Sequence, residues 1–520
     1  MHPVRRILIV GGGTAGWLAA CYLAKTLNSR APGAIAISLV ESSEIPGVGV
    51  GEGTFPSIRG TLSAIGIDEA RFLRTCGATF KQGIRFVDWV RAPGGDGIDH
   101  YFHPFNTPSQ RPGAPDPLPY WLLGDAGAGV PFAEAATMQK RVADAGRAPK
   151  RIGDPDYQGR MNYAYHFDAG RFAALLAEHG QSLGVQRTIA TVVRAERDEA
   201  GDIVGVETRE AGTLVADLYI DCTGFRAALI GEAMGEPLRS VRDTLFVDRA
   251  LAMQVPDDRA DAPLPAYTIS TAHEAGWTWD IALQTRRGVG YVYSSRHSDD
   301  ARAEAVLRRY IGPRADALTP RLLAFDAGWR PMQWKRNCVA IGLAAGFLEP
   351  LESTGIGLIE IATYLVAHLL PPDGDFARIA PRFNEAMNAR YARIVDFLKL
   401  HYCLTRRTDS AFWRDNADPA SIPASLRDLL ALWRHRPPHR LDFVTDLEMF
   451  LPASWQFVLY GMEFATDPAA LRPMHAQSAR AREEFRMLRA VAARAVDDLP
   501  PHRALLDALC ADPPRARVQA

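Results

Sequence analysis

The first forty residues alternate apolar runs with a glycine-rich turn. Residues 6–10 are apolar and lead into three glycines, and residues 15–27 then carry apolar side chains at helical spacing. A second apolar run, residues 35–40, ends at Glu41. Short apolar runs bounded by glycines are typical of buried strands, whereas positions three and four apart form one helix face. The pattern predicts a strand, a tight turn, a helix and a second strand.

The middle of the chain combines helices, loops and strands. Helical spacing predicts two helices between residues 57 and 76, and residues 78–86 alternate as a single strand. Glycine, proline and aspartate dominate residues 91–119, which indicates long loops. Alternating and β-branched residues predict strands within 188–221 and 245–295.

Helical spacing returns near residue 382 and continues toward the C-terminus. Steps of three and four separate Phe383, Met387, Tyr391 and Ile394, so these side chains form one helix face. The C-terminal third is therefore predicted to be mostly helical. No internal repeat, low-complexity tract or Ser/Gly-rich linker marks off an independent domain.

The composition is that of an ordinary globular protein. Of the 520 residues, 47% are hydrophobic, and 59 basic residues balance 60 acidic ones. This balance argues against a nucleic-acid or anionic-membrane partner. The apolar stretch 356–370 contains Glu360 and His368 and is too short to span a bilayer. The N-terminus lacks the features of a secretion signal, so we expect a cytoplasmic protein.

Cysteine and lysine usage adds two smaller points. The six cysteines are scattered without a CxxC pair, so we expect reduced thiols, no disulfide scaffold and no metal site. Only six of the 59 basic residues are lysines. Because arginine supplies charge almost everywhere else, each lysine is somewhat more often needed for its ammonium chemistry.

Residues 11–16 read Gly-Gly-Gly-Thr-Ala-Gly, which satisfies the dinucleotide-binding pattern GxGxxG between a predicted strand and helix. The glycines permit a tight turn and let a pyrophosphate approach the helix N-terminus. An acid at the end of the next strand can accept hydrogen bonds from a ribose. The expected nucleotide contacts are Gly11, Gly13, Thr14, Ala15, Gly16 and Glu41.

This motif alone does not separate FAD from NAD, but two later segments favour FAD. Asp221 ends a predicted strand, and Gly342 follows another one. When several strands of one chain end at the same flavin site, each is expected to end in such a short turn. Each of these segments alone is more often an ordinary turn between a strand and a helix.

Four further segments carry candidate chemistry. Gly51 lies in a glycine-rich loop that could line a ligand or form a surface turn. Lys81 lies in the predicted strand 78–86, where a lysine is usually solvated. Residues 352–355 precede an apolar helix whose free amides could hold a small anion, or they form an ordinary helix cap. Trp277 and Trp279 share one strand face, as core packing or as a site wall.

Together these segments resemble the flavin-dependent halogenases of the tryptophan-halogenase type over nearly the whole chain. The matching pieces are GGGTAGW at 11–17, VGEGTFPSI at 50–58, ATFKQGIRF at 78–86, DCTGFR at 221–226, GWTWDIALQ at 276–284, GYVYSS at 290–295 and FLEPLESTGI at 347–356.

The resemblance implies an α/β fold with an FAD-binding, GR2/PHBH-like Rossmann-type domain fused to a β-sheet substrate region. We place the FAD-binding and catalytic module at 1–400, with its β-rich region at about 226–330. A mainly helical region at 401–520 is expected to cover the substrate site.

The resemblance also implies roles for individual residues. Lys81 and Glu352 correspond to the catalytic pair, and Ser353, Thr354 and Gly355 to the halide site, with Gly51 and Gly355 also close to the flavin. His103 and Phe105 match a segment that sandwiches the substrate ring, although this aromatic loop could equally be plain packing.

The implied activity is halogenation of an electron-rich aromatic substrate that depends on FADH2 and oxygen. Hypohalous acid made from chloride or bromide would be guided to the substrate by Lys81. With one nucleotide fingerprint in the chain, we expect a separate flavin reductase to supply FADH2. A homodimer is among the arrangements that the sequence allows.

Two departures from the family pattern keep alternatives open. Ala282 stands where the WxWxIP signature usually has proline, so a flavin-dependent aromatic monooxygenase remains an alternative. The adjacent tyrosines of tryptophan-specific members are missing, so we expect an indole-like substrate, with free tryptophan as the alternative. The third alternative is not an enzyme: a protein that binds flavin without turning over a substrate.

Overall fold

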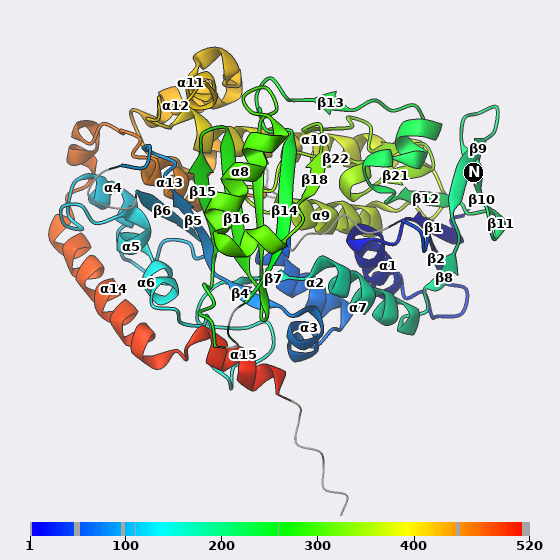
Figure 1. The fold of residues 1–520 in the computed structure, drawn as a ribbon, viewed down its shortest axis with the longest axis horizontal. Coiled ribbons are helices and arrows are strands. Elements are labelled where there is room, and N and C mark those ends of the chain that lie inside the picture. The colour runs from blue at the N-terminus through cyan, green and yellow to red at the C-terminus, as the bar shows by residue number, and fades with distance from the viewer. Residues whose placement is uncertain are drawn as a thin grey trace, which may run out of the picture.

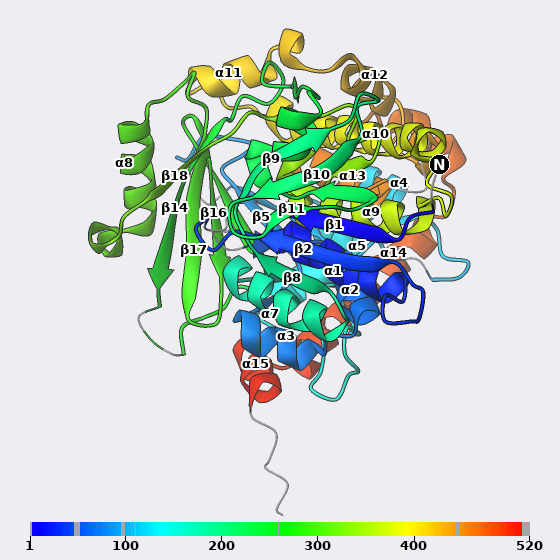
Figure 2. The same cartoon turned by 90° about the vertical axis from the view of Figure 1, so that its right-hand side faces the viewer.

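The computed structural model describes residues 3–45, 52–94, 99–109, 111–257, 259, 261–443 and 448–511. Its two main β-sheets lie side by side, with helices on their outer faces and the C-terminal helices along one edge (Figure 1). Figure 2 shows the same arrangement from the side of the N-terminal sheet.

The N-terminal sheet has six strands in the order β20-β21-β12-β1-β2-β8. All neighbours are parallel except β20 and β21. The strands are β1 (Arg6–Val10), β2 (Ala36–Glu41), β8 (Gln186–Ile189), β12 (Leu218–Asp221), β20 (Trp334–Lys335) and β21 (Cys338–Ala340). Because β1 is central and covered on both faces, it is a continuous apolar run, as parallel strands usually are. Helices α1 (Thr14–Thr26) and α7 (Ala169–Ser182) pack against each other beside it.

The second sheet has seven strands in the order β18-β14-β17-β16-β15-β5-β6. They are β5 (Gly83–Val87), β6 (His100–Pro104), β14 (Arg249–Pro256), β15 (Thr268–His273), β16 (Gly276–Ala282), β17 (Arg286–Tyr293) and β18 (Arg321–Ala324). Alternate residues of β14 serve two cores: Leu251 and Met253 pack with helix α8 (Asp300–Ile311), whereas Ala250 and Ala252 join the main core.

Three smaller sheets complete the β-structure of the described chain. A three-stranded sheet joins β3 (Glu52–Gly53), β7 (Ala164–Phe167) and β4 (Thr79–Lys81). The others contain β9 (Val192–Arg197), β10 (Ile203–Thr208), β11 (Gly212–Leu214), β13 (Arg239–Ser240), β19 (Gly328–Trp329) and β22 (Gly346–Phe347).

The remaining α-helices fall into two groups along the chain. The first group is α2 (Ser57–Ile65), α3 (Glu69–Cys76), α4 (Pro117–Leu122), α5 (Phe132–Ala136) and α6 (Gln139–Asp144). The C-terminal group is α9 (Thr354–Leu369), α10 (Phe376–Cys403), α11 (Ala411–Ala417), α12 (Ala424–Trp433), α13 (Pro452–Gly461), α14 (Ser478–Asp498) and α15 (His502–Cys510). The mixed α/β fold and the helical C-terminal third are confirmed. The domain division stays a prediction, and α10 runs across its boundary at residue 400.

Two local predictions were wrong. Residues 78–86 do not form one strand, because Gln82 leaves the ladder and its backbone N–H donates to the carbonyl of Ala266, so β4 and β5 belong to different sheets. The predicted loops at 91–119 contain strand β6, which pairs with β5 so that Ile84 lies opposite His103. Both errors concern pairing between segments, which the composition of one segment alone does not report.

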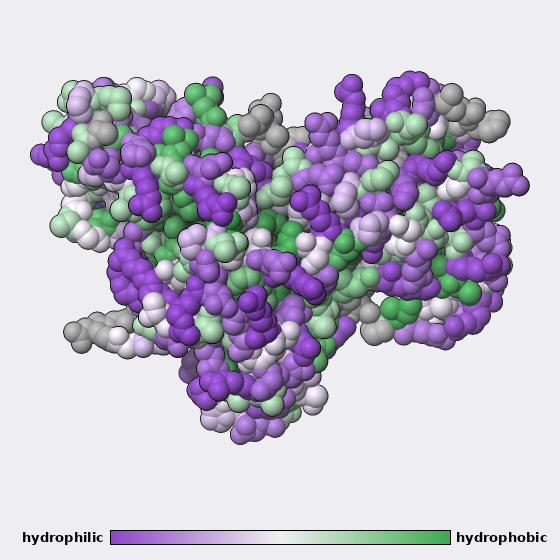
Figure 3. All heavy atoms as spheres, turned by 90° about the horizontal axis from the view of Figure 1, so that it is seen from above, coloured by the Kyte–Doolittle hydropathy of each residue, from purple (hydrophilic) through white to green (hydrophobic). Residues whose placement is uncertain are grey.

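The surface seen in Figure 3 is mostly hydrophilic, with apolar atoms in scattered spots. None of the helices in the described ranges is long and apolar enough to cross a membrane.

Candidate functional site

The glycine turn after β1 leaves room for an anionic group at the N-terminus of α1. Gly11 has φ +112°, and a Cβ there would lie 2.2 Å from the carbonyl oxygen of Cys222. A Cβ on Gly16 would lie 1.8 Å from the carbonyl oxygen of Gly11. By contrast, a Cβ on Gly13 would meet no heavy atom of the described residues within 4 Å. The helix therefore starts with uncapped amides facing open space, which fits a pyrophosphate.

The two acids predicted to contact the cofactor, Glu41 and Asp221, have different hydrogen-bond partners. Glu41 is the last residue of β2, and its carboxylate accepts hydrogen bonds from Arg187 Nε at 2.6 Å and Trp17 Nε1 at 3.4 Å. Asp221 is fully buried and accepts from the backbone of its own loop, including the N–H groups of Leu229 and Ile230 at 2.8 Å. Its carboxylate thus organises residues 223–230, so a cofactor contact of this side chain stays a prediction.

The remaining predicted cofactor contacts are Thr14, Ala15 and three further glycines. Gly342 follows β21 and has φ +71°. A Cβ on Gly342 would lie 2.8 Å from the Cβ of Ala15, so the end of β21 packs against the glycine-rich turn that also contains Thr14. A Cβ on Gly355 would meet no heavy atom of the described residues within 4 Å. Gly51 lies outside the described residues.

The structure places Lys81 and Glu352 in one buried region, where Lys81 contacts the residue next to Glu352 and the charge of Glu352 acts on the pKa of Lys81. Lys81 is the last residue of β4, and its Nζ donates to Ser353 Oγ at 2.9 Å. Both Lys81 and Glu352 are 1% exposed. A Cβ on Gly53 would lie 2.8 Å from Ser353 Oγ and 3.2 Å from Lys81 Nζ, so three distant segments meet at this point.

Two histidines hold the carboxylate of Glu352. His103 Nδ1 lies 3.0 and 3.1 Å from its two oxygens, and His401 Nε2 lies 2.9 Å from Oε1. Burial acts to raise the pKa of Glu352, but His103 and His401 outweigh it and lower that pKa to about 2. His401 Nδ1 also lies 2.9 Å from the carbonyl oxygen of Phe397, an acceptor only. His401 therefore links the backbone of α10 to the carboxylate of Glu352 and fixes the orientation of that carboxylate.

The Lys81 ammonium lies in a less favourable environment. Burial lowers the pKa of Lys81 to about 7, while the nearby charge of Glu352 opposes that shift. The ring of Phe105 lies 5.4 Å from Nζ, within the range of a cation–π contact. Both protonation states of Lys81 are therefore accessible near neutral pH.

Helix α9 begins directly after this pair. Ser353 has φ +58° and makes no side-chain cap hydrogen bond; its Oγ accepts from Lys81 instead. The ordinary helix-cap interpretation of Ser353 is therefore wrong. Thr354 and Gly355 form the first turn, which has no acidic residue, so its amides suit a small anion.

Aromatic side chains line up beside the pair. Phe105 contacts Phe55 at 6.3 Å between ring centroids, Phe55 contacts Phe450 at 5.3 Å, and Phe450 stacks on Phe397 at 3.8 Å. We call these four residues the aromatic wall. His103 lies behind it and is buried against Phe397, so the segment of His103 and Phe105 belongs to the site as well as to the packing.

The two tryptophans of the strand 276–282 are core residues. Trp277 and Trp279 are both buried, with ring centroids 6.5 Å apart. Trp277 Nε1 donates to Glu349, which also accepts from Tyr402. This cluster supports the segment that leads to Glu352.

Sequence reasoning missed three supporting residues. Gly53 and His401 contact the pair as described, and His502 of α15 accepts a hydrogen bond from the N–H of Phe80, next to Lys81, at 3.0 Å. The sequence signal for His401 is its position seven residues after Ile394, which continues the predicted apolar helix face of Phe383, Met387, Tyr391 and Ile394. Among the described residues, no group of three or more His, Cys, Asp or Glu side chains has an arrangement that could hold a metal ion.

Comparison with known proteins identifies the relatives of this chain. The tryptophan halogenase family matches residues 6–479. Tryptophan 6-halogenase SttH of Streptomyces toxytricini is 36% identical over 95% of this chain and 96% of its own length. The solved tryptophan halogenase of Shewanella frigidimarina NCIMB 400 has 42% identity and a TM-score of 0.93, covering 98% of both chains. A flavin-dependent halogenase of Xanthomonas campestris has 36% identity and a TM-score of 0.87, covering 98% and 99%.

These matches confirm the resemblance drawn from the motifs and the expected enzyme class. They span nearly the whole chain, including the segments that carry Lys81 and Glu352. The chain belongs to the tryptophan halogenase family, whose members are flavin-dependent enzymes.

Proposed function

We propose that this chain halogenates an electron-rich aromatic compound of the indole class, using FADH2, oxygen and chloride or bromide. Lys81 and Glu352 are the catalytic residues in this proposal, and Ser353, Thr354 and Gly355 hold the halide. The observation that carries it is a buried ammonium that hydrogen-bonds Ser353, the residue between the buried carboxylate of Glu352 and the open first turn of α9. Such paired ionisable groups are typical of catalytic sites.

FAD fits the turn after β1, where Gly11 and Gly16 permit close backbone packing and Gly13 leaves space over the start of α1. Glu41 retains acceptor capacity for a ribose hydroxyl beside its ion pair with Arg187. Bound reduced FAD supplies, with oxygen, the two-electron oxidation of halide to hypohalous acid. The single fingerprint supports supply of FADH2 by a separate flavin reductase.

Lys81 binds and polarises the oxidised halogen. Its ammonium has three N–H donors, and one of them is used by Ser353. The remaining donors can hydrogen-bond the oxygen of hypohalous acid, which makes the halogen more electrophilic. The ring hydrogen is then replaced by halogen, and the hypohalous oxygen leaves as water.

Glu352 accepts the proton that the ring loses. A halogenated ring cation is a strong acid, so a carboxylate of low pKa is a sufficient base. The histidines His103 and His401 hold the carboxylate in one orientation and keep it ionised. The fixed geometry of Lys81 and Glu352 would also select the ring position that reacts.

Free tryptophan is the second candidate substrate. SttH, named a tryptophan 6-halogenase, supports it through 36% identity over nearly the full length. The chain lacks an adjacent tyrosine pair, which favours a substrate other than the free amino acid.

A product-mass assay tests the proposed function. The protein, FAD, a separate flavin reductase and NADH are incubated with indole or tryptophan, with and without bromide. Products that gain bromine and lose hydrogen only in the presence of bromide support halogenation. Products that gain oxygen regardless of halide would contradict it and support the monooxygenase alternative.

A further inference from the structure

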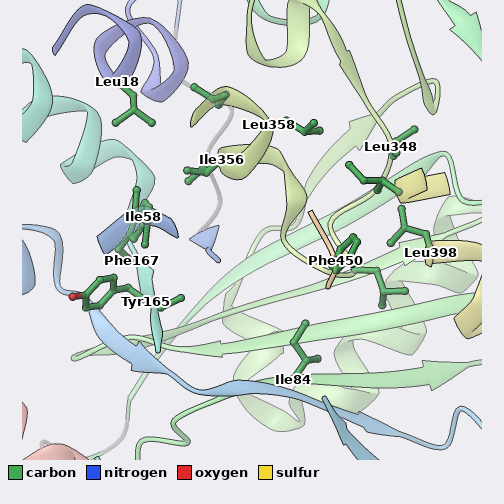
Figure 4. Close-up of a cluster of buried hydrophobic side chains, with 14 of the residues drawn as sticks. Leu18, Ile58, Ile84, Tyr165, Phe167, Leu348, Ile356, Leu358, Leu398 and Phe450 are labelled. Carbon is green, nitrogen blue, oxygen red and sulfur yellow. The ribbon is translucent and has the colours of Figure 1, made fainter. Parts of the chain in front are cut away.

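Strand β4, which ends at Lys81, lies at the edge of its sheet. Among the described strands it pairs with β7 alone, and Phe80 lies opposite Tyr165. The side chain of Tyr165 lies in the main hydrophobic core (Figure 4), and its backbone N–H and carbonyl both bond Thr54, on the side away from β4. Phe80 and Tyr165 therefore exchange no backbone hydrogen bonds, and the N–H of Phe80 points outward from the edge of the sheet.

The imidazole of His502 takes the place of a second strand partner. Its Nε2 accepts from the N–H of Phe80 at 3.0 Å, and its Nδ1 donates to the carbonyl oxygen of Leu264 at 2.9 Å. A backbone N–H can only donate and a carbonyl can only accept, so the ring is neutral and carries its proton on Nδ1. Burial lowers the pKa of His502 to about 4, so this form persists at neutral pH.

The start of α15 also holds the residue on the other side of Lys81. The side-chain Nε2 of Gln82 donates to the carbonyl oxygen of Arg147 at 2.8 Å. Arg147 in turn forms a β-bridge with Pro501, next to His502. Lys81 thus lies between two residues that are anchored at the beginning of α15, and Figure 1 shows this helix below β4.

His502 and Ser353 act on different parts of the lysine strand. The ring of Phe80 lies 5.8 Å from that of His502, whereas the next side chain, Lys81, points to the other face and bonds Ser353. His502 therefore reaches Lys81 through the backbone of β4 and not through the ammonium. Without this acceptor, a buried N–H would lack a hydrogen bond, and the three-residue strand would shift to find another.

We propose that His502 is a positioning residue for halogenation, whose Nε2 fixes the backbone of β4 so that the Lys81 ammonium meets the oxidised halogen in the reactive geometry. This inference rests on the proposed function and adds the helix α15 to the site. Displacing a catalytic group by about 1 Å costs about 100-fold in rate. Loss of the acceptor should therefore lower kcat and leave FAD binding unchanged.

The test replaces His502 by glutamine, asparagine or phenylalanine. The Oε1 of glutamine lies as many bonds from Cα as Nε2 of histidine, so it can accept from Phe80. Asparagine reaches only the position of Nδ1, beside Leu264, and phenylalanine keeps the ring without an acceptor. With chemically reduced FAD and bromide, and the better of indole and tryptophan as substrate, His502→Asn and His502→Phe should lower kcat about 10- to 100-fold. His502→Gln should stay within about threefold of wild type, with KM within about twofold throughout.

His179→Phe is the matched control. His179 of α7 is 8% exposed, and its Nε2 lies 2.8 Å from the carbonyl oxygen of Ile65 at the end of α2. This variant also removes a buried histidine hydrogen bond, but one that does not anchor β4. It should lower Tm about as much as His502→Phe and leave kcat within about twofold of wild type.

The pH profile supplies a readout that a loss of stability alone would not move. The charge of Glu352 acts on the pKa of Lys81, and His166 of β7 is coupled to the same ammonium. Burial and the charge of Lys81 lower the pKa of His166 well below its usual value, and the pKa of Glu352 is about 2, so both keep one charge state above pH 7. Releasing β4 hydrates Lys81, so the inflection near pH 7 should move to higher pH in His502→Phe and His502→Asn, and stay in place in His502→Gln.

Hydrogen exchange at the Phe80 amide, followed by mass spectrometry, tests the bond in wild-type protein even if a variant fails to fold. Exchange should be slow in the wild type and at least tenfold faster in His502→Phe. Wild-type exchange at the rate of an exposed amide, or equal kcat for the glutamine, asparagine and phenylalanine variants, would overturn the inference. A lack of brominated product from wild-type protein with both indole and tryptophan would instead overturn the proposed function.

Discussion

Lys81 Nζ donates a 2.9 Å hydrogen bond to Ser353 Oγ, across 272 positions of sequence. This bond joins the end of a strand in a small connecting sheet to the residue that precedes helix α9. It fixes the ammonium at the residue next to Glu352, and the side chains of Lys81 and Glu352 are both buried. The two groups that the motifs single out therefore share one site.

The pH dependence of halogenation reports the protonation state of Lys81. Because burial lowers the pKa of Lys81 to about 7, the ammonium is lost as pH rises through that value. If the ammonium polarises the oxidant, kcat/KM should fall above about pH 7. The measurement uses chemically reduced FAD, so that the reductase does not contribute to the profile. A rate that rises through pH 7 would show that the neutral amine is the active form.

Titration of Lys81 should also affect the free energy of unfolding, which should rise with pH where kcat/KM falls. Above the lowered pKa of about 7 the folded state releases the Lys81 proton, while the unfolded chain keeps it up to about 10.5. The unfolded state then binds more protons, so this residue makes the free energy of unfolding rise between those values. Lys81→Met should remove that rise, as chemical denaturation at pH 7 and pH 9 would measure.

His401 positions Glu352 and keeps it ionised. Replacing His401 by Phe removes the donor at Oε1, so burial is less opposed and the pKa of Glu352 rises from about 2. Activity should then fall more at pH 5 than at pH 8, relative to wild-type protein. An equal loss at both pH values would indicate that His401 only fills space.

Gly53 is required for the contact between Lys81 and Ser353. A methyl group at this position would lie 2.8 Å from Ser353 Oγ and 3.2 Å from Lys81 Nζ, so Gly53→Ala should lower kcat at least tenfold with FAD affinity retained. Gly60→Ala is the matched control, because Gly60 lies in helix α2 and a Cβ added there would meet no heavy atom of the described residues within 4 Å. That variant should keep full activity and gain about 0.5–1 kcal/mol of stability. Full activity of Gly53→Ala would contradict the geometry of the site.

Gly13 should matter for the cofactor and not for the fold. A Cβ there has open space in the described structure, and the backbone φ of −74° suits any residue. Gly13→Ala should therefore leave the Tm of the FAD-free protein unchanged and weaken FAD binding at least tenfold, measured by flavin fluorescence. Unchanged FAD affinity would place the pyrophosphate elsewhere.

Local pattern predicted the elements near the fingerprint well. The helix at 57–65 and the strand that ends at Glu41 lie where the apolar spacing indicates, because each is defined by its own residues. The break at Gln82 and the strand at His103 depend on pairing with other segments, which spacing alone does not encode. Motif resemblance identified Lys81 and Glu352, but the support from His401, His502 and Gly53 comes from contacts between remote parts of the chain.

The most direct test replaces Lys81 by Met, which keeps the length of the side chain and removes its ammonium. FAD binding is measured by fluorescence, and the products formed from an indole substrate with bromide are measured by mass. The account predicts unchanged FAD affinity and at least a hundredfold loss of brominated product. Brominated product at the wild-type rate in Lys81→Met would contradict it.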